Sequence, residues 1–414
     1  MEAVILAGGL GTRLRGVIGE IPKCMAPVDG KPFLQYQLEW LSRFDVRHVV
    51  LSVGYLREQV MDFVQSREWP FAVSFAIEKE PLGTGGGIRL ALQKCRGKQV
   101  FVLNGDTFYN VDLNALSFTA PVTLALKPMR DFDRYGAVDW DGDLVTGFRE
   151  KKPCAEGLIN GGVYAIDRSQ LDMSLFPKTF SFEREVLEPL ADYGLVAGEV
   201  QEGYFIDIGI PEDYARAQRE LPEIQAVLKA SDAVLASGAD TLFLDRDGVI
   251  NRWLPGDYVR TWDQFAFLPG IRESLRKWAA KFRHILLVSN QRGVGKGKMT
   301  QAELEAVHAR MLAEISTTGG RIDAIYTCTE LAPEHPMRKP QTGMFQSACR
   351  DFPDIDPARS LMLGDSDSDR EFAANCGMGF VLMETADLTL RFQEAYCWPL
   401  SRPLSASSPA VSPL

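Results

Sequence analysis

The stretch that decides the fold of the N-terminal half is Leu6-Ala7-Gly8-Gly9-Leu10-Gly11-Thr12-Arg13-Leu14. It follows an apolar run, 3–5, that favours a buried strand. Glycines directly after a parallel strand let backbone N–H groups approach a phosphate chain with no Cβ in the way. Arg13 adds a forked positive charge. The spacing fits neither the G-x-G-x-x-G nor the P-loop pattern, and by itself the stretch also fits a tight turn.

Outward from this stretch, short apolar runs alternate with helical patterns. The apolar runs include 49–53 and 100–103, and the helical patterns include 56–66 and 88–95. This alternation favours an α/β fold, a mostly parallel sheet with helices on both faces. It restarts at Thr241, after an Ala- and Ser-rich segment without a strand. We therefore expect two different three-layer α/β/α domains, 1–225 and 240–390, a linker at 226–239 and a disordered Ser-, Pro- and Ala-rich tail at 402–414.

Composition excludes several classes of protein. The chain has 414 residues, which favours two hydrophobic cores. Its 45 basic and 55 acidic residues give a net charge of -10, so we expect no nucleic-acid or membrane partner, and any phosphate must be bound locally. Seven scattered cysteines without a Cys-x-x-Cys pair indicate reduced thiols. With no signal-peptide pattern and no long apolar run, we expect a cytoplasmic protein that binds small molecules; a homo-oligomer stays open.

Polar residues recur at other predicted strand ends of the first half. Asn104-Gly105-Asp106 follows one strand, and Asp207 lies at the end of another. Two such carboxylates, together with phosphate oxygens, would suit an octahedral Mg²⁺. A second glycine-rich turn spans 83–87, and Asn160-Gly161-Gly162 lies further along. Each could be a plain turn, but together they predict a ligand site.

These motifs, with Pro22-Lys23 and Glu150-Lys151, resemble the sugar-1-phosphate nucleotidyltransferases over residues 1–222. The stretches 157–164 and 180–183 are similar to those of D-glycero-α-D-manno-heptose 1-phosphate guanylyltransferases. The resemblance implies a Rossmann-like domain in which Arg13 and Lys23 neutralise a triphosphate and Asp106 and Asp207 hold Mg²⁺. It implies sugar-phosphate contacts from Lys151, Asn160 and Gly161. The expected nucleotide contacts are Leu6, Gly8, Gly9, Gly11, Thr12, Glu78, Gly83, Thr84, Asn104 and Gly105. Glu78 would accept from the N1 and N2 donors of guanine, and the alternative for this residue is a solvated surface carboxylate.

A second set of polar residues marks the strand ends of the C-terminal half. Asp245-Arg246-Asp247-Gly248 follows the strand at 241–244. Ser289, Lys339 and the acidic run Gly364-Asp365-Ser366-Asp367-Ser368-Asp369 follow further along. A nucleophilic carboxylate, a hydroxyl, a lysine and an acidic metal cluster are the groups that aspartyl-phosphate chemistry requires.

This set resembles the haloacid dehalogenase superfamily of phosphatases, and its motifs are similar to those of heptose-bisphosphate and histidinol-phosphate phosphatases. The resemblance implies that Asp245 attacks phosphorus and that Asp247 is the acid and base. Ser289, Asn290, Arg292 and Lys339 would hold the phosphate. Mg²⁺ would be bound by Asp245, Asp365 and the backbone carbonyl of Asp247, with support from Asp369.

The spacing of the phosphatase motifs leaves no room for a cap domain. A zinc site is also not expected, because only Cys328 and His335 remain as ligands in the segment 328–338, too few to close one.

Together the two halves predict a bifunctional enzyme. We expect the C-terminal domain to dephosphorylate D-glycero-α-D-manno-heptose 1,7-bisphosphate and the N-terminal domain to transfer GMP onto the heptose 1-phosphate. Three alternatives are another nucleotide and sugar phosphate, a histidinol-phosphate or general phosphatase, and a non-catalytic sensor of sugar nucleotides. The sensor is disfavoured because Lys23, Asp106 and Asp207 are all present.

Overall fold

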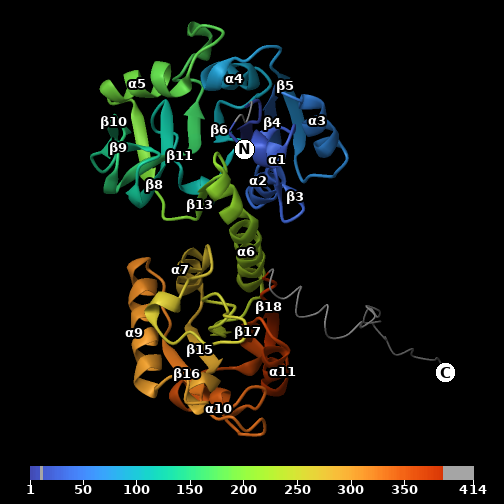
Figure 1. The fold of residues 1–414 in the computed structure, drawn as a ribbon, viewed down its shortest axis with the longest axis vertical. Helices are drawn as coiled ribbons and strands as arrows, with labels where there is room; N and C mark the ends of the chain where they lie inside the picture. Colours follow the sequence, from blue (N-terminus) through green and yellow to red (C-terminus); the bar gives the residue numbers. More distant parts are fainter. Residues whose placement is uncertain (10–12, 386–414) are drawn as a thin grey trace, which may run out of the picture.

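The structure, a computed structural model, consists of two α/β domains joined by one long helix (Figure 1). It describes residues 1–9 and 13–385. Gly11 and Thr12 of the first glycine stretch lie outside the described residues, and so does the tail predicted at 402–414.

The N-terminal domain is built on a nine-stranded sheet in the order β10-β9-β11-β6-β1-β4-β5, with β8 paired to β11 and β12 to β8. The strands β6, β1, β4 and β5 are mutually parallel, as the alternation of runs predicts. The strand bounds are β1 Glu2–Leu6, β4 His48–Val53, β5 Ala72–Ile77, β6 Gln99–Asn104, β8 Val122–Phe132, β9 Gly136–Trp140, β10 Val145–Lys151, β11 Cys154–Asp167 and β12 Val196–Val200.

Beyond β6 the sheet departs from the expected parallel arrangement. Strand β11 runs antiparallel to β6, β8 and β9, and β10 antiparallel to β9. The reason is local: the described chain between β6 and β11 contains no α-helix, and only a long crossover can return a chain parallel to its neighbour. The helices of this domain are α1 Arg15–Ile18, α2 Phe33–Leu41, α3 Arg57–Gln65, α4 Gly83–Leu92 and α5 Glu188–Asp192. Two short ladders, β2 Pro27–Val28 with β3 Lys31–Pro32 and β7 Thr107–Tyr109 with β13 Phe205–Asp207, lie off the main sheet.

The C-terminal domain has a fully parallel five-stranded sheet in the order β16-β15-β14-β17-β18. Apolar clusters fill both faces of this sheet, as a parallel sheet covered by helices requires. The strands are β14 Thr241–Leu244, β15 His284–Asn290, β16 Ala324–Cys328, β17 Ser360–Gly364 and β18 Gly379–Leu382. The helices are α7 Ile271–Lys281, α8 Arg292–Gly295, α9 Gln301–Thr317, α10 Gly343–Asp351 and α11 Asp367–Cys376.

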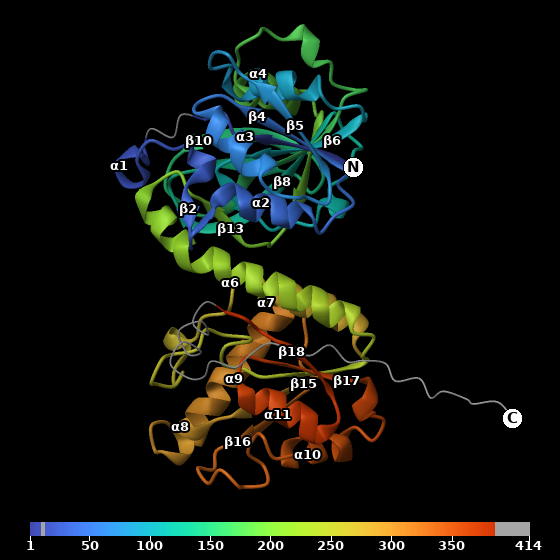
Figure 2. The ribbon, with the colours of Figure 1, turned by 90° about the vertical axis from the view of Figure 1, so that its right-hand side faces the viewer.

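Helix α6, Pro211–Ala236, is shared by the two domains (Figure 2). Leu221, Ile224 and Leu228 belong to the core of the first domain. Val227 and Val234 belong to the core of the second. Most of the segment 226–239 expected to be a linker is therefore helical and packed. Like every helix among the described residues, α6 lacks the apolar length needed to cross a membrane.

Two candidate active sites

The first glycine stretch and the Asn104-Gly105 turn form one wall each of a cavity of about 330 Å³ in the N-terminal domain. The two turns touch: the Gly105 N–H donates to the Leu6 carbonyl, and a Cβ on Gly105 would lie 2.3 Å from that oxygen. Only glycine therefore fits at 105. The cavity is lined by Leu6, Ala7, Gly8, Gly9, Lys23, Cys24, Glu78, Pro81, Leu82, Gly83, Thr84, Asn104, Gly105 and Asp106.

Glu78 lines this cavity rather than facing open solvent. One carboxylate oxygen accepts from Ser52 Oγ at 2.8 Å, and the other accepts from the Leu82 N–H at 3.3 Å. A Cβ on Gly8 would come within 2.6 Å of the same carboxylate. The side chain is thus fixed beside the first glycine stretch, with acceptor capacity left for a ligand.

The second glycine-rich turn serves packing as well as the cavity. Gly83 has a φ of 69° and begins helix α4. A Cβ on Gly85 would lie 2.2 Å from the Phe180 ring, so this glycine lets the segment around Phe180 approach the helix. The Thr84 hydroxyl donates to Glu183 at 2.6 Å and accepts from the Phe182 N–H at 2.9 Å.

A second cavity of about 480 Å³ adjoins the first, with Asn104 and Asp106 common to both. It brings together Arg13 and Lys151, which are exposed, and Asn160. Gly161 does not line it: a Cβ there would lie 2.4 Å from the Tyr109 ring, which makes Gly161 a packing position on β11. The lining is Arg13, Asn104, Asp106, Thr107, Arg134, Tyr135, Lys151, Asn160, Gly162, Phe205 and Asp207.

Lys23 lies between the two carboxylates predicted to hold a metal ion. Its Nζ forms an ion pair with Asp106, and it lies 3.8 Å from Asp207 Oδ1. Burial raises the pKa of Asp207, and the nearby charge of Asp106 adds to this while Lys23 opposes it. Two carboxylates that need a neighbouring cation fit a divalent ion bound with phosphate oxygens.

Sequence reasoning missed Arg134, Tyr135 and Gln37 at this site. Arg134 lines the second cavity and forms an ion pair with Asp213 at the start of α6. Buried Gln37 donates to the carbonyls of Asn104 and Thr107, each at 2.8 Å, and so holds the turn that carries Asp106. The hydrophobic pattern could not single out Arg134 and Tyr135, because they lie between strands and outside any glycine motif.

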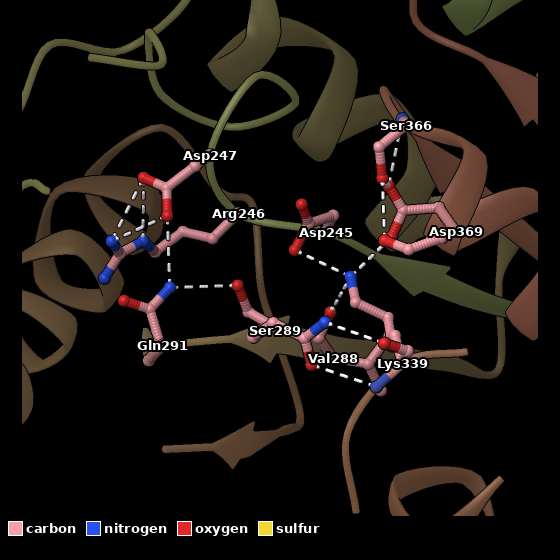
Figure 3. Close-up of polar contacts among 11 residues, drawn as sticks. Asp245, Arg246, Asp247, Val288, Ser289, Gln291, Lys339, Ser366 and Asp369 are labelled. Atoms are coloured by element: carbon pink, nitrogen blue, oxygen red, sulfur yellow. Dashed lines mark hydrogen bonds and ion pairs between the residues drawn. The ribbon is translucent and has the colours of Figure 1, made fainter. Parts of the chain in front are cut away.

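In the C-terminal domain the predicted residues meet at the carboxyl edge of the parallel sheet (Figure 3). Asp245 follows β14, Ser289 is the second-to-last residue of strand β15, and Asp365 follows β17. Neighbouring parallel strands end at the same edge, which brings residues distant in sequence together. Lys339 completes the group: its Nζ is 2.9 Å from Asp245 Oδ1, 2.5 Å from Asp369 Oδ1 and 2.9 Å from the Val288 carbonyl.

Charge balance at this edge depends on Lys339. Burial by itself lowers the pKa of Lys339, but Asp245 and Asp369 raise it well above its usual range. Burial also raises the pKa of Asp245 to about 6 against the opposing effect of Lys339. The lysine is therefore charged and neutralises part of a buried acidic cluster.

Three carboxylates, those of Asp245, Asp365 and Asp369, each offer an oxygen within 4.8 Å of the others, and all three residues are buried. Buried carboxylate oxygens with an incomplete balance of charge fit a hard divalent cation such as Mg²⁺. A Cβ on Gly248 would lie 2.0 Å from Asp365 Oδ2, so the glycine after Asp247 makes room for this carboxylate. Asp369 is additionally held by the N–H and hydroxyl of Ser366 at 3.1 and 2.6 Å.

The carboxylate of Asp247 faces a different set of groups. It accepts from the fully buried Arg246 at 2.9 Å, from Asn251 at 2.9 Å and from Gln291 at 3.1 Å. Burial would raise the pKa of Asp247, but Arg246, Asn251 and Gln291 together lower it. Arg246 also contacts His308 Nε2 at 3.2 Å. Arg246, Asn251 and Gln291 were not predicted as site residues.

The predicted phosphate-binding residues take different positions. Ser289 Oγ is buried and accepts from Gln291 at 3.0 Å. The Asn290 side-chain amide donates to the Lys339 carbonyl at 3.1 Å and accepts from the Lys339 N–H at 3.0 Å. These two hydrogen bonds fix the loop that carries Lys339, here called the lysine loop. Arg292 begins α8, and its buried Nε has no hydrogen-bond partner among the described residues.

The two residues considered as zinc ligands lie near each other: Cys328 Sγ is 3.9 Å from His335 Nδ1.

Known families match both halves of the chain. The Nucleotidyl transferase family matches residues 2–224, and the HAD-hydrolase-like family matches residues 336–389. The D-glycero-α-D-manno-heptose 1-phosphate guanylyltransferase of Aneurinibacillus thermoaerophilus is 45% identical over 226 residues, which are 53% of this chain and 98% of that protein. The enzyme of the same description from Campylobacter jejuni is 43% identical over 216 residues, 52% of this chain and 97% of that protein.

The C-terminal half has a relative of its own. The D-glycero-α-D-manno-heptose-1,7-bisphosphate 7-phosphatase of Mycobacterium bovis is 42% identical over 139 residues, which are 32% of this chain and 71% of that protein. The two family matches cover both cavities of the first site and, in the second site, Lys339, Asp365 and Asp369. The chain therefore belongs to the nucleotidyl transferase family through its N-terminal domain, to which a HAD-like phosphatase domain is joined in a bifunctional enzyme.

Proposed function

We propose that the chain converts a heptose bisphosphate into a GDP-heptose in two steps. The C-terminal domain removes the 7-phosphate of D-glycero-α-D-manno-heptose 1,7-bisphosphate, and the N-terminal domain transfers GMP from GTP to the resulting heptose 1-phosphate. The observation that carries this proposal is that each domain has a polar site containing carboxylates, and that the chain is similar to two enzymes whose descriptions each name one of these two substrates.

In the phosphatase step, a carboxylate oxygen of Asp245 attacks phosphorus as the bond from phosphorus to the sugar oxygen breaks. Asp247, in its protonated form, gives the departing oxygen its proton. Water then attacks phosphorus in the aspartyl phosphate and Asp247 takes the proton of that water. The bond from phosphorus to the Asp245 oxygen breaks, which releases inorganic phosphate and regenerates the Asp245 carboxylate. Lys339, buried beside Asp245, neutralises charge on the transferred group, and Ser289 holds one of its oxygens.

Mg²⁺ would be held by Asp245, Asp365 and the backbone carbonyl of Asp247 in this domain, and by Asp106 and Asp207 in the other. When bound, it supplies positive charge to phosphate oxygens. The protein residues do the positioning: Asp369 and Ser366 fix the acidic cluster, and Asn290 fixes the lysine loop.

In the transferase step, a phosphate oxygen of heptose 1-phosphate attacks the α-phosphorus of GTP and pyrophosphate leaves. The smaller cavity, with the glycine stretch and Glu78, suits the nucleotide, and the larger one, with Lys151 and Asn160, suits the sugar phosphate. They adjoin at Asn104 and Asp106, where the two phosphates would meet. Arg13 and Lys23 neutralise charge, and no covalent nucleophile is needed.

The test is a one-pot reaction of the purified chain with the bisphosphate, GTP and Mg²⁺, followed by phosphorus NMR. We expect inorganic phosphate, pyrophosphate and a GDP-sugar. Free phosphate without any GDP-sugar would refute the coupled function. Parallel reactions with ATP, CTP and UTP determine whether GTP is the preferred nucleotide. A parallel reaction with histidinol phosphate determines whether the heptose bisphosphate is the preferred phosphatase substrate.

A further inference from the structure

One ion pair crosses from the shared helix α6 to the loop behind the phosphatase acid and base. Glu223 accepts from Arg252 Nη2 at 2.6 Å and from Arg252 Nε at 2.9 and 3.0 Å. The Glu223 side chain is 7% exposed and that of Arg252 is 25% exposed. A forked, largely buried pair of this kind fixes both side chains and the backbone that carries them.

The loop held by Arg252 is the one that holds Asp247. Asn251 Nδ2 donates to Asp247 Oδ1 and to the Arg252 carbonyl, both at 2.9 Å. The Gly248 N–H donates to the Asn251 carbonyl at 2.7 Å. The position of Arg252 therefore sets where Asn251 meets Asp247.

The same helix turn also reaches the transferase domain. Glu220 lies 3.7 Å from Arg252 Nη2 and accepts from the Tyr204 hydroxyl at 2.9 Å. Tyr204 directly precedes strand β13, which ends at Asp207. A chain of polar contacts thus leads from the transferase strand β13 through α6 to Asp247.

We propose that Glu223 and Arg252 are a positioning pair for Asp247, so that the phosphatase site is completed by the helix that also closes the transferase domain. This inference rests on the proposed phosphatase function. The side chain of Arg252 pairs with Glu223 and Glu220 and contacts neither the Asp245 nor the Asp247 carboxylate. It acts through Asn251, and a small misplacement of Asp247 weakens proton transfer to the departing sugar oxygen.

The test compares two phosphate esters that differ in their need for that proton. A sugar alkoxide must be protonated as it leaves, whereas p-nitrophenolate leaves without help. Glu223→Gln should lower kcat/KM on the heptose bisphosphate by about 10-fold, a part of what general acid catalysis supplies, and on p-nitrophenyl phosphate by less than about 2-fold. Transfer of GMP onto supplied heptose 1-phosphate should be unchanged.

Lys229→Gln is the matched control, since it breaks another ion pair from α6 to the second domain, with Glu384, in which both side chains are exposed. It should leave both esters unaffected. A double variant, Glu223→Gln with Arg252→Gln, should lose no more kcat/KM on the bisphosphate than either of the two single variants, because both substitutions break the same pair.

Equal losses on both esters would overturn the proposal, because they indicate a general structural role, and so would full activity of Glu223→Gln on the bisphosphate. A wild-type chain that hydrolyses neither ester would instead refute the phosphatase function itself.

Discussion

At the scale of single residues, Gly248 shows why the acidic motif needs a glycine. Its φ is 89°, and a Cβ would lie 2.0 Å from Asp365 Oδ2. We expect Gly248→Ala to reduce phosphatase activity by at least about 100-fold, because it displaces a proposed metal-binding carboxylate as well as straining the backbone. Gly256 has a φ of 72° with open space around it, so Gly256→Ala isolates the backbone strain. Similar activities of the two variants would contradict the role of Asp365.

Glu78 is the residue proposed to recognise guanine. A carboxylate that accepts from N1 and N2 of the base prefers GTP to ITP, which lacks the N2 amine. Glu78→Gln should raise KM for GTP by about 10-fold, as expected for one charged hydrogen bond. The difference in KM between GTP and ITP should become smaller. The control is Glu80→Gln, an exposed carboxylate two residues away that pairs with Lys178. An unchanged ratio of GTP to ITP would place the base elsewhere.

We expect His308 to make the stability of the phosphatase domain sensitive to pH. Burial, together with the charge of Arg246, lowers the pKa of His308 to about 4. The unfolded chain therefore binds more protons between pH 4 and pH 6.5, and the free energy of unfolding falls as pH decreases through that window. His308→Gln keeps an acceptor for Arg246 but does not titrate. Its melting temperature should fall less than that of the wild type on acidification. Parallel plots of melting temperature against pH for the two proteins would contradict the role of His308 in this pH dependence.

At the scale of elements, helix α6 determines where the domains can be separated. Ala226, Val227, Ala230 and Val234 are buried in the core of the phosphatase domain. A fragment that starts at residue 240 exposes the apolar surface those side chains cover, whereas one that starts at 211 retains it. We expect the longer fragment to melt cooperatively by circular dichroism and the shorter one to aggregate or melt without a sharp transition. Equal stability of the two would mean that α6 belongs to the first domain alone.

The elements also show what can be learned from sequence. Asp106, Asp245, Ser289 and Asp365 were predictable because the carboxyl ends of neighbouring strands share one edge. Arg134 and Gln291 were not, because their roles arise from tertiary contacts that leave no periodicity in the sequence. The Ala- and Ser-rich composition suggested a linker at 226–239, but most of this segment is helical and its apolar side chains pack against two cores. Likewise, Gly85 and Gly161 fitted a ligand turn yet serve close packing.

At the scale of the whole molecule, the chain has a net charge of -10, so we propose that it binds its anionic substrates only at the two local sites. Each offsets its carboxylates with a lysine, Lys23 in one domain and Lys339 in the other. The sites use separate residues on separate sheets, joined by α6 (Figure 1). Each activity should therefore be removable without the other.

The most direct measurement is phosphorus NMR of the Asp245→Asn and Asp106→Asn chains, each given the bisphosphate with GTP and, separately, heptose 1-phosphate with GTP. Asp245→Asn should release no phosphate from the bisphosphate yet form the GDP-sugar from supplied heptose 1-phosphate. Asp106→Asn should release phosphate and stop at heptose 1-phosphate, and mixing the two variants should restore the GDP-sugar. Loss of both activities in either folded variant would contradict two separate sites in one chain.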